Sequence, residues 1–163
     1  GKDTLYTFLD YLEDSFLVRV VALHTASERQ RMVHPRKIYP VDPGLIPVYE
    51  RSGRLNLGHA LETAVLVELE RRGCEVAYLR TADGYEVDFL ARAPEGRWTL
   101  LQVCADLADA STREREVRAL AAAATEYPEA TPLLLTLDAI PPQPALPAPL
   151  QWQAAAGWLL GDA

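Results

Sequence analysis

Apolar side chains recur at helical spacing near the start of the chain, at Leu5, Phe8, Leu9 and Leu12. This i, i+3, i+4, i+7 pattern predicts an amphipathic helix over residues 3–14. Two runs typical of short strands follow at residues 17–23 and 38–41, and turn-forming residues end the second. The polar segment between them, residues 25–37, is expected to be a long loop. Because helix, strand, loop and strand resemble the back half of a winged helix, residues 1–50 are predicted to be a partial winged-helix-like segment.

The longest helical pattern covers residues 58–72 and ends at Gly73, a residue type favoured directly after a helix. Ser111 and Glu114 have the spacing of a capping box, which predicts that a second helix begins there and runs to about Tyr127. The strand-like runs are residues 74–80, 85–92, 97–105 and 131–137. A proline-rich segment, 140–149, is predicted to be an extended linker, and residues 151–160 a C-terminal edge strand with Trp152 and Trp158 over the core.

The element order from residue 58 is therefore helix, three strands, helix, strand. Short turns at residues 81–84 and 93–96 join the first three strands as antiparallel hairpins. A meander followed by a crossover helix and another strand predicts an α/β sandwich over residues 51–163.

Composition narrows the class of protein. The chain has 163 residues, which suits one domain or one domain with an appendage, and 49% hydrophobic residues exclude wholesale disorder. No window approaches the roughly 18 apolar residues of a membrane span, so no membrane partner is expected. A net charge of −7 argues against non-specific binding to nucleic acid through bulk charge. Two cysteines cannot form a disulfide framework, and we expect a cytoplasmic protein.

Three polar side chains are predicted to converge at one end of the sheet. Strand alternation places Glu86, Asp88 and Leu90 on one face, and a hairpin centred near residue 95 sets Asp88 opposite Gln102. Glu62 lies on the apolar stripe of its helix, where a carboxylate is costly without a partner. A helix-end carboxylate favoured by the helix dipole is the alternative for Glu62, and a solvated strand face is the alternative for Glu86 and Asp88.

This arrangement resembles the PD-(D/E)XK, or restriction-endonuclease-like, superfamily. There a helix acid, a strand aspartate and a Glu-x-Lys on the next strand bind Mg²⁺ and activate water. The resemblance implies that Glu62 corresponds to the helix acid and Asp88 to the strand aspartate. It covers about residues 58–137.

A longer series of motifs is similar to the domain of unknown function that follows the ATPase module in prokaryotic AAA-type ATP-binding proteins. The series is TLYTFLDYLEDSFLV, KIYPVDPGL, LETAVLVELERRG, RTADGYEVDFLA and LLQVC, in that order. The resemblance implies that an ATPase module, or another protein, is the partner. It also implies that any ATP would bind outside this chain, which contains no P-loop. Met32 is the only methionine, so we expect the chain to be part of a longer protein.

The site departs from this family at two positions. Where the family has Glu-Val-Lys, the chain reads Gln102-Val103-Cys104. A neutral amide is a poorer ligand for Mg²⁺ than a carboxylate, and cysteine lacks the positive charge that would stabilise a phosphate. Glu62, Asp88, Gln102 and Cys104 are therefore interpreted as the remains of a nuclease site, with no catalytic residue and no metal or other cofactor. Cys104 is expected to be a small buried side chain.

Gln102 is further predicted to replace the missing cation. Its amide has two N–H donors, which can hold neighbouring carboxylates together where a glutamate would add negative charge. This hypothesis requires Gln102 to lie within hydrogen-bonding reach of Asp88 or Glu62.

A small basic group in the predicted wing loop is the candidate for nucleic-acid contact: Arg29, Arg31, Arg36 and Lys37. Solvated loop charge is the alternative. The arginines of the second predicted helix alternate with Glu114 and Glu116 and are interpreted as a solvated helix face.

The leading functional hypothesis is a non-enzymatic accessory or interaction domain of a AAA-type ATP-binding protein. The alternatives are a metal-dependent nuclease with a variant site that uses Mg²⁺, and a module that binds DNA weakly through the basic wing.

Overall fold

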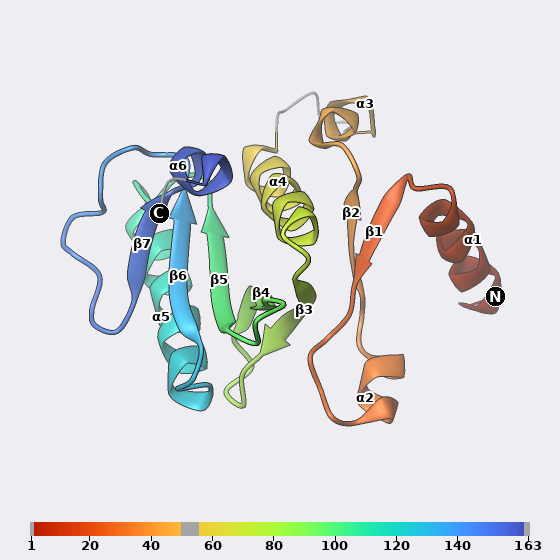
Figure 1. Cartoon of the computed structure of the whole chain (residues 1–163), viewed down its shortest axis with the longest axis horizontal. Coiled ribbons are helices and arrows are strands. Elements are labelled where there is room, and N and C mark those ends of the chain that lie inside the picture. Colours follow the sequence, from red (N-terminus) through yellow and green to blue (C-terminus); the bar gives the residue numbers. More distant parts are fainter. Residues whose placement is uncertain (1, 50–55, 162–163) are drawn as a thin grey trace.

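A computed structural model describes residues 2–49 and 56–161, and it has an α/β architecture (Figure 1). The N-terminal part is built around a two-stranded antiparallel ribbon, in which Arg19 pairs with Tyr39. Its elements are α1 (Lys2–Asp14), β1 (Val18–Val21), α2 (Glu28–Val33), β2 (Lys37–Pro40), the 3₁₀ turn η1 (Pro43–Leu45) and α3 (Ile46–Tyr49). The helix expected at the start of the chain and both short strands are confirmed.

The rest of the described chain forms a five-stranded mixed sheet with the strand order β3-β4-β5-β6-β7. Neighbours β3, β4 and β5 are antiparallel, whereas β5, β6 and β7 are parallel. The elements are α4 (Leu57–Arg71), β3 (Glu75–Arg80), β4 (Glu86–Arg92), β5 (Trp98–Cys104), α5 (Ala110–Glu126), β6 (Thr131–Thr136), β7 (Gln151–Ala154) and α6 (Ala155–Leu160). The predicted order of helix, three strands, helix and strand is confirmed.

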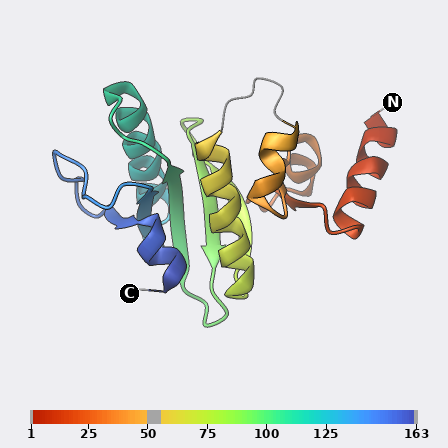
Figure 2. The same cartoon turned by 90° about the horizontal axis from the view of Figure 1, so that it is seen from above.

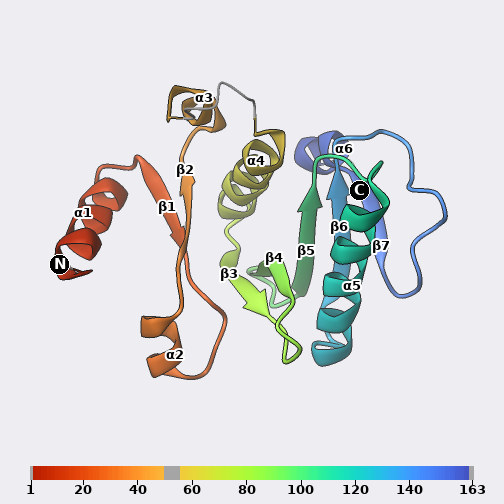
Figure 3. The ribbon, with the colours of Figure 1, turned by 180° about the vertical axis from the view of Figure 1, so that it is seen from behind.

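Helices cover both faces of this sheet (Figure 2). On one face, side chains of α4 and α6 such as Leu66 and Trp158 pack with Phe89 and Leu101 of the sheet. Helix α5 lies on the other face, which Figure 3 shows from behind. Its side chains pack against the sheet side chains that alternate with those of the first layer. Two buried layers of apolar residues therefore hold the sheet in place.

The ends of α4 and α5 show how local sequence sets helix boundaries. Gly73 has a φ of 74° directly after α4, a conformation that glycine adopts without steric cost, as predicted. At the start of α5 the prediction is wrong, because the capping residue is Asp109 rather than Ser111. The Asp109 Oδ2 accepts hydrogen bonds from the Thr112 amide at 2.7 Å and from the Ser111 hydroxyl at 2.6 Å. A carboxylate is a stronger acceptor than a hydroxyl at a helix N-terminus.

The N-terminal ribbon shares a hydrophobic core with the sheet. Tyr39 of β2 is 1% exposed and its ring lies 5.6 Å from the ring of Phe89. An isolated parallel bridge joins Leu23 to Tyr78 of β3. The predicted domain boundary between residues 50 and 51 lies outside the described residues.

Two segments predicted as irregular or extended have other structures. Residues 28–33, expected to be part of a loop, form α2, because the Ser27 side chain accepts the Gln30 amide and caps a first turn. The predicted edge strand over 151–160 ends at Ala154, and the chain continues as α6. Trp158 of α6 is therefore buried on the sheet face that α4 covers.

The proline-rich segment 140–149 connects two neighbouring parallel strands of one sheet, β6 and β7, and does not link separate units. The Arg113 guanidinium of α5 donates to the carbonyl oxygens of Gln143, at 2.8 Å, and of Pro144. Leu146 packs against the core layer under α5. Among the helices of the described ranges, none is long and apolar enough to cross a membrane.

Candidate functional site

A hollow of about 500 Å³ lies where α4, β4, β5 and α5 meet. Its walls include all four residues of the predicted vestigial site and two further acids, namely Glu62, Asp88, Gln102, Cys104, Glu86 and Glu116. The structure therefore brings together the residues predicted to converge. It adds the carboxylates of Glu86, which was predicted on the strand face of Asp88, and of Glu116, which was predicted on a solvated helix face.

Asp88 is the centre of the site, and an irregularity in β4 positions it. Ala77 of β3 pairs with Leu90, whereas Leu79 pairs with Val87, so β4 has one extra residue at this point. The simple alternation predicted for β4 is therefore wrong at Val87, which packs in the same buried cluster as Leu90. The bulge re-aims the Asp88 carboxylate, which is only 8% exposed, toward the end of the neighbouring strand β5.

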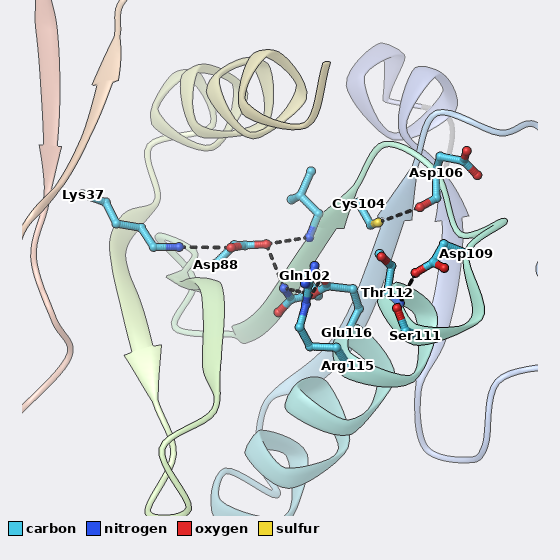
Figure 4. A network of polar contacts seen from close by, with 11 residues as sticks. Lys37, Asp88, Gln102, Cys104, Asp106, Asp109, Ser111, Thr112, Arg115 and Glu116 are labelled. Carbon is cyan, nitrogen blue, oxygen red and sulfur yellow. Dashed lines mark hydrogen bonds and ion pairs between the residues drawn. The ribbon is translucent and has the colours of Figure 1, made fainter. Parts of the chain in front are cut away.

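Gln102 holds two carboxylates: Asp88, as the sequence predicts, and Glu116 in place of Glu62. Phe89 pairs with Leu101 in the hairpin, which is the predicted register. The Gln102 Nε2 donates to Asp88 Oδ2 at 3.0 Å and to Glu116 Oε2 at 2.6 Å (Figure 4). The Val103 amide donates to the same Asp88 oxygen at 2.9 Å. Both amide hydrogens of Gln102 are thus used on carboxylates.

The remaining oxygen of that amide, Gln102 Oε1, is buried and has no hydrogen-bond partner within the described residues. Rotating the amide by half a turn would place this oxygen against two carboxylates. The two hydrogen bonds would then be lost and acceptor atoms would face each other, which costs more than one unpaired oxygen. The orientation of the side chain is therefore set by the acids around it.

Lys37 enters the site from β2 of the N-terminal ribbon, so its assignment to a solvated wing is wrong. Its Nζ lies 3.0 Å from Asp88 Oδ1 (Figure 4). It also lies 2.8 Å from Glu86 Oε1, and the Lys37 side chain is 21% exposed. Burial opposes the charged form of Lys37, but the charges of Asp88 and Glu86 outweigh it and raise the pKa of the ammonium. Lys37, predicted to lie in a loop, is the first residue of β2. In the folded protein it meets Asp88, which is 51 residues further along the chain.

Glu62 is half-buried on α4 and accepts a hydrogen bond from the Tyr39 hydroxyl at 3.0 Å. Burial, together with the negative charge of Asp88, raises the pKa of Glu62 to about 7. Burial also raises the pKa of Tyr39, whose ring stacks on His59 at 5.4 Å. The alternative of a carboxylate at the helix end does not hold, because Glu62 is the sixth residue of α4 and lies beyond its first turn.

Glu116 of α5 belongs to the site, and its interpretation as part of a solvated face is wrong. It is 7% exposed, and Arg115 donates to its Oε1 from Nε at 3.0 Å and from Nη2 at 2.5 Å. A signal exists in the sequence, since Glu116 is three and four residues before Ala119 and Leu120 on the apolar stripe of its helix. The same argument that identifies Glu62 would have found it.

Cys104 is buried at the edge of the hollow, as expected. Its Sγ donates to the carbonyl oxygen of Asp106 at 3.0 Å. Burial raises the pKa of the thiol, which keeps it protonated.

The other three predicted wing residues remain at the surface and do not join Lys37. Arg31 pairs with Glu28 at 2.9 Å within α2. The Arg36 guanidinium lies 5.5 Å from the ring centre of Tyr6 in α1. Arg29 is exposed on α2.

The chemistry of the donors does not suit Mg²⁺. Of the two Asp88 oxygens, one faces the Lys37 ammonium and the other accepts two N–H groups. Gln102 turns its nitrogen rather than its oxygen toward the acids, and ammonium and amide hydrogens cannot ligate a cation. Across residues 2–49 and 56–161, no three His, Cys, Asp or Glu side chains are grouped so that they could hold a metal ion.

Comparison with protein-family models, with curated proteins and with solved structures finds no significant match to this chain.

Proposed function

We propose that this chain is a non-catalytic interaction domain with a PD-(D/E)XK nuclease-like fold, in which the former nuclease site has become a structural polar core. The order of the elements and the convergence of Glu62, Asp88 and Gln102 support the resemblance to that superfamily. We further propose that the domain serves as an accessory to the ATPase module of a AAA-type ATP-binding protein, for which the ordered motif series is the support.

The observation that carries the proposal is the Lys37 ammonium beside Asp88. Metal-dependent hydrolysis of a phosphodiester needs carboxylates that are open to a divalent cation, and a group that stabilises the attacking water or the phosphate. Here the Lys37 ammonium supplies the positive charge, and the neutral amide of Gln102 joins Asp88 to Glu116. Because the Lys37 ammonium is paired with both Asp88 and Glu86, it takes the structural place of the divalent cation and does not replace the lysine of the Glu-x-Lys motif.

A nuclease assay tests the loss of activity. Incubated with single- or double-stranded DNA or RNA and Mg²⁺ or Mn²⁺, the protein is expected to give no cleavage above buffer. Cleavage that Asp88→Ala abolishes and the exposed turn variant Asp83→Ala retains would overturn the proposal. Cleavage that both variants retain comes from a contaminant and is removed by further purification.

The ATPase association has its own test. The gene region that encodes residues preceding Gly1 is expected to contain a P-loop, Gly-x-x-x-x-Gly-Lys-Ser/Thr, in an ATPase module. A full-length protein without such a motif would refute this part of the proposal.

A further inference from the structure

The hollow between α4, β4, β5 and α5 carries more negative charge than the side chains around it neutralise. In the part of the chain that the structure describes, its walls contain four carboxylates and one guanidinium, that of Arg115. Arg115 pairs with Glu116, and the Lys37 ammonium pairs with both Asp88 and Glu86. Four negative charges therefore meet two positive charges at this site.

Glu62 is the carboxylate of this hollow that has no cation of its own. Its Oε2 accepts a hydrogen bond from the Tyr39 hydroxyl at 3.0 Å. Among the described residues, none of the ion pairs includes Glu62. Burial and the negative charge of Asp88 raise the pKa of Glu62 to about 7, so that only part of its side chains is ionised at neutral pH.

Gln102 provides a second acceptor that lacks a donor. Its side chain is 4% exposed and lines the same hollow. The amide stands between Asp88 and Glu116, because its nitrogen donates to both, and its Oε1 has no hydrogen-bond partner within residues 2–49 and 56–161. A buried acceptor without a donor is unfavourable. The surplus carboxylate and this amide oxygen are therefore complementary to one kind of group, a cation that carries N–H donors.

The exposed side chain of Arg115 gives access to the amide. Arg115 donates to Glu116 Oε1 while Gln102 donates to Glu116 Oε2, so the Arg115 guanidinium lies beside the amide (Figure 4). The Arg115 side chain is 69% exposed and can therefore move aside into solvent. A second guanidinium that takes its place would have Glu116, Gln102 and Glu62 around it, since all three line the hollow.

We propose that this hollow binds a guanidinium group. A guanidinium presents several N–H donors in one plane and is more weakly hydrated than an ammonium, so it can donate to several buried acceptors at once. The hollow, about 500 Å³, has the size of a small-ligand site. A free small molecule and an arginine side chain of a partner protein offer the same group. The proposal rests on the proposed function, because the acids are open to an organic cation only where they no longer hold Mg²⁺.

An NMR titration of the whole chain with methylguanidinium tests this binding. The backbone amide of Val103 is the reporter, because it donates to Asp88 and Val103 lines the hollow. At pH 8 its resonance is expected to shift to saturation. N-methylurea, which has the same shape without the charge, and tetramethylammonium, which has the charge without N–H donors, are expected to give no saturable shift. Glu62→Gln should weaken the binding by about tenfold or more, whereas the exposed Glu129→Gln should leave it unchanged.

The affinity is also expected to depend on pH through Glu62. The titratable and charged groups around Glu62 are Lys37 and Tyr39 of β2, Asp88 of β4, Glu116 of α5, and His59 of its own helix, which stacks on Tyr39. The cation binds the ionised carboxylate, and ionisation increases as the pH rises through about 7. The affinity should therefore rise by about tenfold from pH 6 to pH 8, and Glu62→Gln should remove this dependence.

Acetyl-arginine N-methylamide distinguishes the two sources of the group. Binding of this blocked arginine as tightly as methylguanidinium supports an arginine of a partner protein, and binding of methylguanidinium alone supports a free small molecule.

Several outcomes would overturn the proposal. These are the absence of a saturable shift with methylguanidinium, an equal response to N-methylurea, equal affinity at pH 6 and pH 8, and displacement of methylguanidinium by Mg²⁺. A positive nuclease assay refutes the proposed function whatever methylguanidinium does. Absence of cleavage together with absence of binding refutes the guanidinium site alone.

Discussion

Lys37 is the residue on which the polar core depends. It is the cation placed between Asp88 and Glu86, and Asp88 is almost fully buried. A buried carboxylate left without its cation costs several kcal/mol, although the remaining N–H donors of Gln102 and Val103 reduce that cost. The pair is therefore more important as protection against an uncompensated charge than as a source of net stability.

Replacing Lys37 by methionine, which retains the length but not the charge, is expected to lower the free energy of unfolding by about 2–4 kcal/mol. Urea unfolding measures this change. The matched variant Arg31→Met breaks an exposed pair and should cost less than about 1 kcal/mol. Adding Asp88→Asn to Lys37→Met should recover part of the lost free energy of unfolding. Equal effects of Lys37→Met and Arg31→Met would contradict the role given to Lys37.

Glu62 makes stability depend on pH. Its pKa is raised from 4.5 to about 7 in the folded protein, mainly by burial, so the folded state holds this proton more tightly than the unfolded chain. Stability is therefore lost as the pH rises from about 4.5 to about 7, and the loss persists above that range.

Glu62→Gln retains an acceptor for the Tyr39 hydroxyl and removes the charge. Relative to the unmodified protein, the variant is expected to be more stable by about 1–3 kcal/mol near pH 8 and nearly unchanged near pH 4. Denaturant unfolding at the two pH values measures the difference, with the exposed Glu129→Gln as control. A variant with the same effect at both pH values would show that Glu62 is not held protonated.

At the scale of single elements, α4 and β4 place the acids. α4 runs from the Asn56 cap to the Arg72 cap, which Gly73 follows, and it presents Glu62 on the side of Val65 and Leu66. β4 needs its extra residue for Asp88 to leave the simple alternation of the strand. The site is thus set by a helix with defined ends and by a bulged strand.

Gly73 is the position at which a helix end can be tested. Gly73→Ala is expected to destabilise the protein by about 1–2 kcal/mol, because φ is 74°, a conformation that is strained for a residue with a Cβ. Gly58→Ala, in the first turn of the same helix, meets nothing closer than 3.7 Å and should be neutral or stabilising by up to about 1 kcal/mol. Thermal unfolding of the two variants gives the comparison, and equal shifts would contradict the argument.

At the scale of the whole molecule, the ribbon and the sheet are joined by both a core and a charge. Val21, Leu23 and Tyr39 of the N-terminal part lie in the same buried cluster as Phe89. The Lys37 contact with Asp88 crosses the same junction. The two parts are therefore expected to unfold together.

All three tryptophans belong to the sheet part, namely Trp98, Trp152 and Trp158. The ring of Trp98 also lies 5.8 Å from the ring of His24 in the N-terminal part. Val21→Ala in β1 is expected to lower the urea midpoint seen by their fluorescence, by a free energy of about 1–3 kcal/mol. Val33→Ala, at a residue that is 75% exposed, should leave the midpoint unchanged. A Val21→Ala protein with an unaltered tryptophan transition would mean that the ribbon unfolds independently.

The sequence by itself determined α1, α4, α5 and the strands, but not α2 or α6, because helical spacing, strand alternation and turn residues are local properties of the chain. It also determined that Asp88 and Gln102 would meet, since a tight hairpin sets the register of its two strands. Glu116 was within reach of the same periodicity argument, and was missed because the charges around it suggested a solvated face.

Only the tertiary structure decided which cation completes the site. Lys37 and Asp88 are 51 residues apart, and no local pattern links them, because their meeting depends on how the ribbon packs against the sheet through Tyr39 and Phe89. The bulge that changes the direction of Asp88 likewise arises from the pairing of β4 with β3. The alternation of residues within β4 alone does not predict it. Long-range packing therefore set both the Lys37 contact and the position of Asp88. The reason is that packing decides which polar groups are buried, and a buried polar group must have a partner.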